Sequence, residues 1–208
     1  MAVTNLRDAL VDEIRDIYNA EKQIVKALPR IVKGVTSDEL SEALQSHLKE
    51  TQGHVTRLER VFELLDEKAR GKQCAGMEGI LEEGSQALEE DAEDSVKDAM
   101  LIAGCQRVEH YEITAYGTCI AWAQALGLDE VAEVLEETLA EEKAADEKLS
   151  AIAESGINEA ATAGESEDDM EGDEDRDSRS TNETDAESVS ARSASSASRP
   201  ARQRGGRR

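Results

Sequence analysis

Residues 107–118 read RVEHYEITAYGT, and this stretch decides the fold. Apolar side chains recur here at three- and four-residue steps, the period of an amphipathic helix, and the apolar stripe they form runs through Glu109 and Glu112. The two glutamates are three residues apart, so a helix presents both on one face. We therefore predict a long helix, capped by Ser95 and ending near Leu126, with two carboxylates in its apolar stripe.

The same period continues on both sides of this stretch and predicts a helical chain. Further helices are expected over about 4–33 (disturbed by Pro29 and closed by Gly34), 36–68 (opened by the capping-box pattern TSDE), 77–90, and from a cap at Asp129 to about Glu154. Long helices with short connections are typical of an antiparallel four-helix bundle. The stretch of about 25 residues between the second and third long helices leaves room for an extra packed helix or for a crossover.

Polar side chains interrupt the apolar stripe near the middle of every long helix. The interrupting residues are Glu21; His47, Glu50, Thr51 and His54; Glu109 and Glu112; Glu142 and Asp146. Because mid-helix positions of antiparallel neighbours lie at one level, we expect these side chains to converge in one layer of the core. Buried carboxylates cost several kcal/mol each, about 3–5 when left unpaired, and the stripes supply no lysines beside them. The layer therefore requires a metal, or its acids must be largely protonated.

The donor atoms of this layer indicate which metal it would hold. Oxygen-rich ligation with one or two imidazoles suits iron or manganese better than zinc. Glu109 and Glu112 are three residues apart, and the pairs Glu50/His54 and Glu142/Asp146 four apart, so each pair shares one helix face. The general pattern of a dinuclear carboxylate site is one glutamate from each of two helices and a Glu-x-x-His pair from each of the other two.

Each of these residues also has a simpler explanation. The acids could be solvated side chains at the edge of the apolar stripes, in a chain that is acidic throughout. His54 is either a ligand or a histidine outside the ligand set, whereas His47 and His110 are better explained by packing or by hydrogen bonds to ligands. Cys105 and Cys119 are expected to be small core residues, and Cys74, in a predicted loop, to be the reactive thiol. Tyr18, Tyr111 and Tyr116 are expected to fill the core, and the alternative is that they donate hydrogen bonds to ligands or relay electrons.

Four segments resemble the YciE/YciF family of ferritin-like stress proteins. They are YNAEKQ (18–23), HLKETQGH (47–54), RVEHYEITAYGT (107–118) and EETLAEEKAADEKL (136–149). The similarity covers about residues 5–154, and AEKQ and EHYE are more distantly similar to rubrerythrin. The resemblance implies a ferritin-like bundle, a homodimer, a stress role and a site for two iron ions, with manganese as the alternative metal.

Carried over residue by residue, the resemblance implies five carboxylate ligands: Glu21, Glu50, Glu109, Glu112 and Glu142. Two positions depart from the family pattern. The ligand histidine of the second long helix corresponds to Gly53, and His54 follows it; in the fourth, the analogous position is Ala145, and Asp146 follows it. We therefore add His54 and Asp146 as candidate ligands. The rubredoxin-like cysteine pairs of rubrerythrin, its electron relay, are missing from the sequence.

Composition narrows the function classes further. The chain carries 47 acidic and 24 basic side chains, a net charge of −23, which repels nucleic-acid phosphates from the folded domain. No apolar run approaches the ~20 residues of a membrane span. An odd number of cysteines and the absence of a signal-peptide pattern predict a cytoplasmic protein. The surface acidity predicts a halophilic host with a high-salt cytoplasm.

Two parts with different composition follow one another. Residues 1–155 are expected to form the helical bundle, and residues 156–208 a disordered tail with an acidic part (159–187) and an arginine- and serine-rich part (188–208). The basic end is either an adhesive arm for anionic partners or a solubilising segment.

Two functions are compatible with these observations. The first is a ferritin-like stress-response protein, an oxidoreductase or peroxidase whose dinuclear iron or manganese site reacts with peroxide or oxygen. In it, Glu112 and an acid from a facing helix bridge the metals. The second is a non-catalytic stress or interaction protein with a vestigial or structural metal site.

Overall fold

The computed structural model describes residues 3–163, which consist of helices and their connections with no strand in that range. The helices are α1 (Leu6–Gly34), α2 (Asp38–Leu64), α3 (Ala75–Glu89), α4 (Asp94–Ala125), α5 (Asp129–Ile152) and the short α6 (Asn158–Ala163). The all-α prediction is confirmed. Within residues 3–163, no helix combines the length and the apolar character that crossing a membrane requires.

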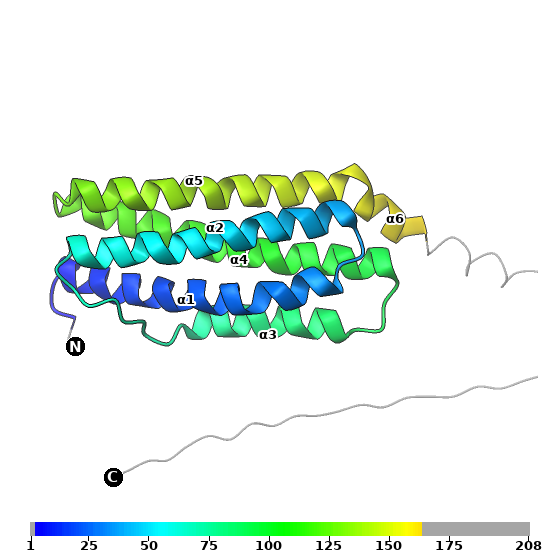
Figure 1. Cartoon of the computed structure of the whole chain (residues 1–208), viewed down its shortest axis with the longest axis horizontal. Helices are drawn as coiled ribbons and strands as arrows, with labels where there is room; N and C mark the ends of the chain where they lie inside the picture. The colour runs from blue at the N-terminus through cyan, green and yellow to red at the C-terminus, as the bar shows by residue number, and fades with distance from the viewer. Residues whose placement is uncertain (1–2, 164–208) are drawn as a thin grey trace, which may run out of the picture. The chain divides into compact units, whose positions relative to one another are not determined.

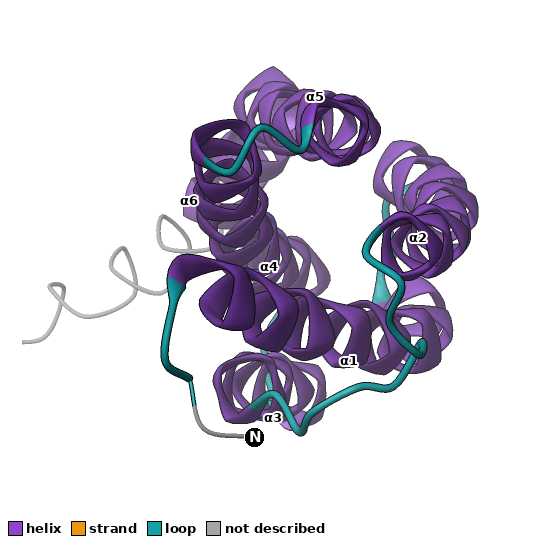
Figure 2. Cartoon of the chain, turned by 90° about the vertical axis from the view of Figure 1, so that its left-hand side faces the viewer, coloured by secondary structure: helices purple, strands orange, loops and turns teal. Residues whose placement is uncertain are grey.

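Four of the helices form an antiparallel bundle. Around its axis they follow the order α1, α2, α5, α4, and each runs antiparallel to both neighbours (Figures 1 and 2). The connection between α2 and α4 runs along the bundle and contains α3, which packs outside the ring against α1 and α4 (Figure 2). Both expectations for this stretch are thus realised, because the extra helix forms part of the crossover.

Some of the predicted helix ends are confirmed and others are wrong. Gly127, with a left-handed φ of 69°, ends α4 as expected and allows the tight turn into α5. The predicted caps at Ser95 and Asp129 are wrong: Ser95 lies within the first turn of α4, and Asp129 is the first residue of α5. Pro29 does not end α1, which continues to Gly34.

A buried carboxylate of α4 caps α2 from outside. Asp98 accepts hydrogen bonds from the backbone amides of Thr36 (2.9 Å) and Ser37 (2.8 Å) and from the Thr36 hydroxyl (2.8 Å). The N-cap residue of α2 is Ser37, whose side chain accepts from the Leu40 amide, and not Thr36, with which the predicted capping box begins. These contacts give a buried acid all the partners that its charge requires.

The core consists of two apolar clusters with a polar layer between them. Members of the first cluster include Leu10, Ile14, Ile17, Leu58, Phe62, Tyr116 and Leu135. Members of the second include Ile24, Leu28, Leu40, Leu44, Ile102, Cys105, Leu149 and Ile152. On each bundle helix the two clusters are separated by the interrupting residues that the sequence singled out. The apolar clusters therefore enclose those residues along the bundle axis.

The helical structure continues past the boundary predicted at residue 155. A kinked segment, Ala153–Ile157, leads into α6, and Ile157 packs against the second apolar cluster, which explains why the chain stays ordered there. The rest of the predicted tail, 164–208, with its arginine- and serine-rich end, lies outside the described residues.

Candidate metal centre

Six side chains from all four bundle helices meet in the polar layer of the core. They are Glu21 of α1, His47 and His54 of α2, Glu109 and Glu112 of α4, and Glu142 of α5. The five other than His47 are at most 1% exposed, and His47 is 6% exposed. The convergence predicted from the mid-helix positions is thus present in the structure.

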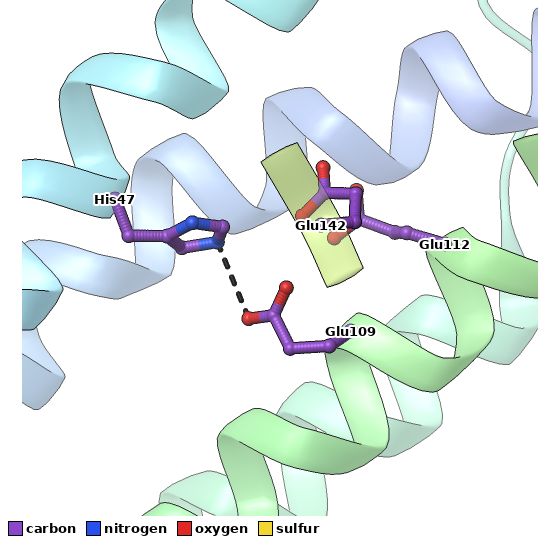
Figure 3. Close-up of side chains that lie close together, drawn as sticks. All are labelled: His47, Glu109, Glu112 and Glu142. Carbon is purple, nitrogen blue, oxygen red and sulfur yellow. Dashed lines mark ion pairs between the residues drawn. The ribbon is translucent and has the colours of Figure 1, made fainter. Parts of the chain in front are cut away.

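Potential ligand atoms form two groups, in each of which they lie within 4.8 Å of one another. The outer group consists of His47, Glu109, Glu112 and Glu142 (Figure 3), and the inner group of Glu21, His54 and Glu142. Glu142 belongs to both groups. Each of the two groups could hold a metal ion.

Most of the polar atoms in this layer lack a hydrogen bond. Both carboxylate oxygens of Glu112 and of Glu142, Oε2 of Glu21 and of Glu109, both ring nitrogens of His47, and Nδ1 of His54 are buried without such a partner. A buried polar atom left unpaired costs about 1–3 kcal/mol, and more when it is charged. So many unsatisfied ligand atoms facing one another fit a cation that would coordinate them.

Burial and mutual repulsion oppose ionisation of the acids on α4. Burial, reinforced by the neighbouring carboxylates, raises the pKa of Glu109 and of Glu112 well above the ordinary value. Burial also raises the pKa of Glu21. Without a metal these groups favour the protonated form, and a bound cation would supply the charge that stabilises their anions.

His54 supplies the positive charge of the metal-free inner group. Its Nδ1 lies 2.8 Å from Glu142 Oε1 and 3.5 Å from Glu21 Oε1. Burial opposes protonation of the ring, but the contacts with these two acids outweigh it and raise the pKa of His54 to about 10. Burial acts in the opposite direction on Glu142 and raises its pKa. The contact with His54 outweighs this effect and leaves the pKa of Glu142 below its ordinary value. A metal ligated by Nδ1 would replace this proton.

Residues around the inner group hold its ligands in place. His54 Nε2 lies 2.8 Å from Glu141 Oε2, and Glu141 in turn accepts two hydrogen bonds from Arg57, at 2.5 and 2.7 Å. On the other side, the Tyr116 hydroxyl donates to Glu21 Oε1. Ligating histidines commonly give their second N–H to a carboxylate in this way, which leaves Nδ1 of His54 free to face the centre.

His47 is arranged in a similar way in the outer group. Its Nε2 lies 3.3 Å from Glu109 Oε1 (Figure 3), and its Nδ1 lies 3.7 Å from Glu50 Oε2. The sequence interpretation of His47 as a residue that packs or hydrogen-bonds to ligands did not place it among the candidate ligands, whereas the structure does. A signal was present, because residues 40, 44, 47, 51, 54 and 58 follow helical three- and four-residue steps that place both histidines in the apolar stripe.

Two predicted ligands lie outside both groups. The Glu50 side chain is 44% exposed and contacts the outer nitrogen of His47. Asp146 accepts a hydrogen bond from Gln106 and lies 3.3 Å from the exposed His110. Both acids occupy the edge of the stripe, where a helix turns a side chain towards solvent.

Cys74 does not match its prediction as a reactive loop thiol. It is fully buried at the start of α3, where its sulfur lies 3.0 Å from the Tyr111 hydroxyl, and burial raises the pKa of the thiol. A thiol that is inaccessible and protonated is a poor nucleophile.

Known proteins share this fold and much of this sequence. Residues 5–162 match the family described as a domain of unknown function, DUF892. Protein YciF of Escherichia coli K12 is 39% identical over 162 residues, which span 77% of this chain and 98% of YciF. The crystal structure of the E. coli stress protein YciF superposes on this chain with a TM-score of 0.73, over 75% of this chain and 99% of YciF.

Two further structures extend the comparison. The YcfI protein of Rhodopseudomonas palustris is 44% identical, with a TM-score of 0.70 over 71% of this chain and 94% of that one. A protein from Xanthomonas campestris pv. campestris, 24% identical, shares the fold with a TM-score of 0.61 over 77% of this chain and 99% of that one.

Proposed function

The chain belongs to the DUF892 family, and on this premise we propose that it is a stress-response metalloprotein that binds two iron or manganese ions in its bundle and reacts there with peroxide or oxygen. The observation that carries the proposal is the convergence of buried carboxylate and imidazole atoms from four helices, most of them without a hydrogen bond. The stress role is supported by the likeness to YciF, which is titled a stress protein.

The side chains divide the work between the two groups. We assign the outer group of His47, Glu109, Glu112 and Glu142 to one ion, and the inner group of Glu21, His54 and Glu142 to the other. Redox-active ions bound there would supply the electrons that reduce the oxidant. The apolar clusters on either side of the layer keep Glu21 and His54 out of contact with solvent, which strengthens the charge interactions of the inner group.

The direct test is elemental analysis followed by peroxide consumption. The wild-type protein, purified with iron and manganese supplied, is expected to hold about two ions per chain and to consume peroxide. Glu109→Gln and Glu142→Gln are expected to lose metal and turnover together, because each removes an anionic ligand. Glu147→Gln, which changes an exposed acid of α5, is the matched control and keeps both.

Each outcome selects between the two candidate functions. Wild-type protein without metal would contradict the proposal. Bound metal that stabilises the fold and consumes neither peroxide nor oxygen would establish the structural alternative. The cytoplasmic location and the homodimer both remain predictions. Sedimentation of the purified chain tests the homodimer.

A further inference from the structure

The two ligand groups differ in their access to solvent. A cavity of about 140 Å³ opens between α2 and α5, and its lining includes His47 and Glu109 of the outer group. It includes neither Glu21 nor His54 of the inner group, and both of those residues are 0% exposed. A solute that enters from this side therefore meets the outer group first.

Small side chains keep this opening free. Where α2 and α5 face each other along the cavity, they contribute Ala43 and Ser46 from one helix and Ala144 and Ala145 from the other. Larger side chains at these positions would fill the space with carbon atoms. The cavity reaches His47 and Glu109, whose Nε2 and Oε1 atoms lie 3.3 Å apart, and Glu109 Oε2 is buried there without a hydrogen bond.

Charged side chains line the same opening. Glu50 is half exposed and lies 3.7 Å from His47, so it extends the line of ligand atoms outward from the buried layer. Glu141 also lines the cavity, but its charge is paired with Arg57. Lys148 is the basic residue of the lining and is exposed. Glu50 is thus the carboxylate that an incoming cation would contact before it reaches His47.

We propose that the α2–α5 cavity is the route by which a divalent cation reaches the centre, and that Glu50 is a transit residue for it. The outer group receives the ion, and the inner group is filled through Glu142, which the two groups share. The inference rests on the proposed function, since it presupposes that the centre binds metal. It concerns how fast the centre fills, whereas the ligand set decides how much it holds.

The rate of cobalt uptake by the metal-free, full-length protein tests this route. Co²⁺ bound to oxygen and nitrogen ligands absorbs visible light, so stopped-flow absorption reports filling without any enzymatic activity. Glu50→Gln is expected to slow uptake roughly tenfold, the low end of what a charged entrance adds to an association rate. Lys148→Gln is expected to speed uptake, since it removes repulsion at the same opening. The matched control Glu42→Gln, an exposed acid of α2 that does not line the cavity, is expected to leave the rate unchanged.

A steric variant tests the same route without a change of charge. Ala144→Leu places a larger side chain at an exposed helical position of the cavity lining and is expected to slow uptake several-fold. Ala151→Leu, at another exposed alanine of α5 outside the lining, is the control. In all these variants the final amount of cobalt bound is expected to equal that of the wild type.

The outcomes separate this inference from the proposed function. A wild-type protein that binds no cobalt would overturn both. Normal binding, with Glu50→Gln and Ala144→Leu filling at the wild-type rate, would overturn the route and leave the centre in place. A lower final stoichiometry in Glu50→Gln would make Glu50 a ligand and overturn its transit role.

Discussion

Glu141 Oε2 lies 2.8 Å from Nε2 of His54, whose other ring nitrogen faces the acids of the inner group. The imidazole is therefore held from outside by a carboxylate that Arg57 neutralises. This contact fixes which nitrogen is available to a metal, and it connects the buried layer to the surface of the bundle.

Removal of the Glu141 carboxylate should weaken metal binding at equilibrium. Glu141→Ala is expected to lower metal affinity by about 10–100-fold, the usual cost of losing a residue that orients a ligand. A competition titration with a chelator measures it. Glu137→Ala is the control, because Glu137 contacts Arg57 at 3.4 Å but has no contact with His54. Equal affinities in the two variants would contradict the orienting role.

Replacement of a buried acid should stabilise the metal-free fold while abolishing its function. Both carboxylate oxygens of Glu112 are unpaired, so Glu112→Leu is expected to raise the free energy of unfolding of the metal-free protein by about 1–4 kcal/mol. Urea denaturation measures this change. The same variant should lose the stabilisation that added metal gives the wild type. A variant less stable than the wild type without metal would show that the carboxylate is paired.

The metal-free fold should weaken as the pH rises. The pKa of His54 is about 10 in the folded protein and 6.5 ordinarily, so its contribution is complete below 6.5 and is lost as the pH rises towards 10. The raised pKa values of Glu109 and Glu112 act in the same direction, because folding favours their protonated forms. The lowered pKa of Glu142 costs stability only as the pH falls below its ordinary value of 4.5.

Denaturation of chelator-treated protein at several pH values measures this trend. Each proton whose loss the fold opposes contributes at most about 1.4 kcal/mol per pH unit. The metal-loaded protein should show a flatter dependence, because the bound cation stabilises the unprotonated ligands. Metal-free protein that gains stability between pH 6.5 and 10 would contradict these assignments.

Asp98 should behave as a structural acid. Asp98→Ala removes the carboxylate that accepts three hydrogen bonds from Thr36 and Ser37 at the start of α2. This change is expected to cost about 2 kcal/mol of unfolding free energy, with no change in metal content. Thermal unfolding and elemental analysis check the two halves of this prediction. Asp91→Ala, at an exposed acid just before α4, is the control and should change neither. Loss of metal in Asp98→Ala would assign it to the centre.

The net charge of −23 predicts a fold that gains stability from salt. Like charges on the bundle surface repel one another in dilute buffer and are screened in molar KCl. The helical circular dichroism signal and the melting temperature should both rise with KCl concentration. An unchanged signal between dilute buffer and molar KCl would exclude a halophilic adaptation.

Helical periodicity alone locates most of the centre. Glu21, Glu109, Glu112 and Glu142 each interrupt an apolar stripe, and a carboxylate at such a position is expensive enough to be recognised. Periodicity also places His47 in the apolar stripe of α2, with Glu50 at the edge of that stripe. The packing of α2 against its neighbours brings His47 to Glu109 and leaves the Glu50 side chain 44% exposed.

Helical periodicity also does not identify the residues that contact the polar layer from outside. Glu141 and Arg57 look like ordinary surface charges, and only the packing of α5 against α2 brings them to His54. Cys74 follows a polar stretch that reads as an exposed loop, yet it becomes buried where α3 packs beside Tyr111.

The sequence by itself thus determined the helices, the antiparallel bundle and the level at which acids collect, because these depend on local periodicity and on the cost of burying charge. Only the tertiary structure decided which side chains share a group, which histidine nitrogen faces inward, and that the α2–α5 cavity reaches His47 and Glu109. Those features depend on the rotation and spacing of neighbouring helices, which side-chain packing sets across the whole bundle.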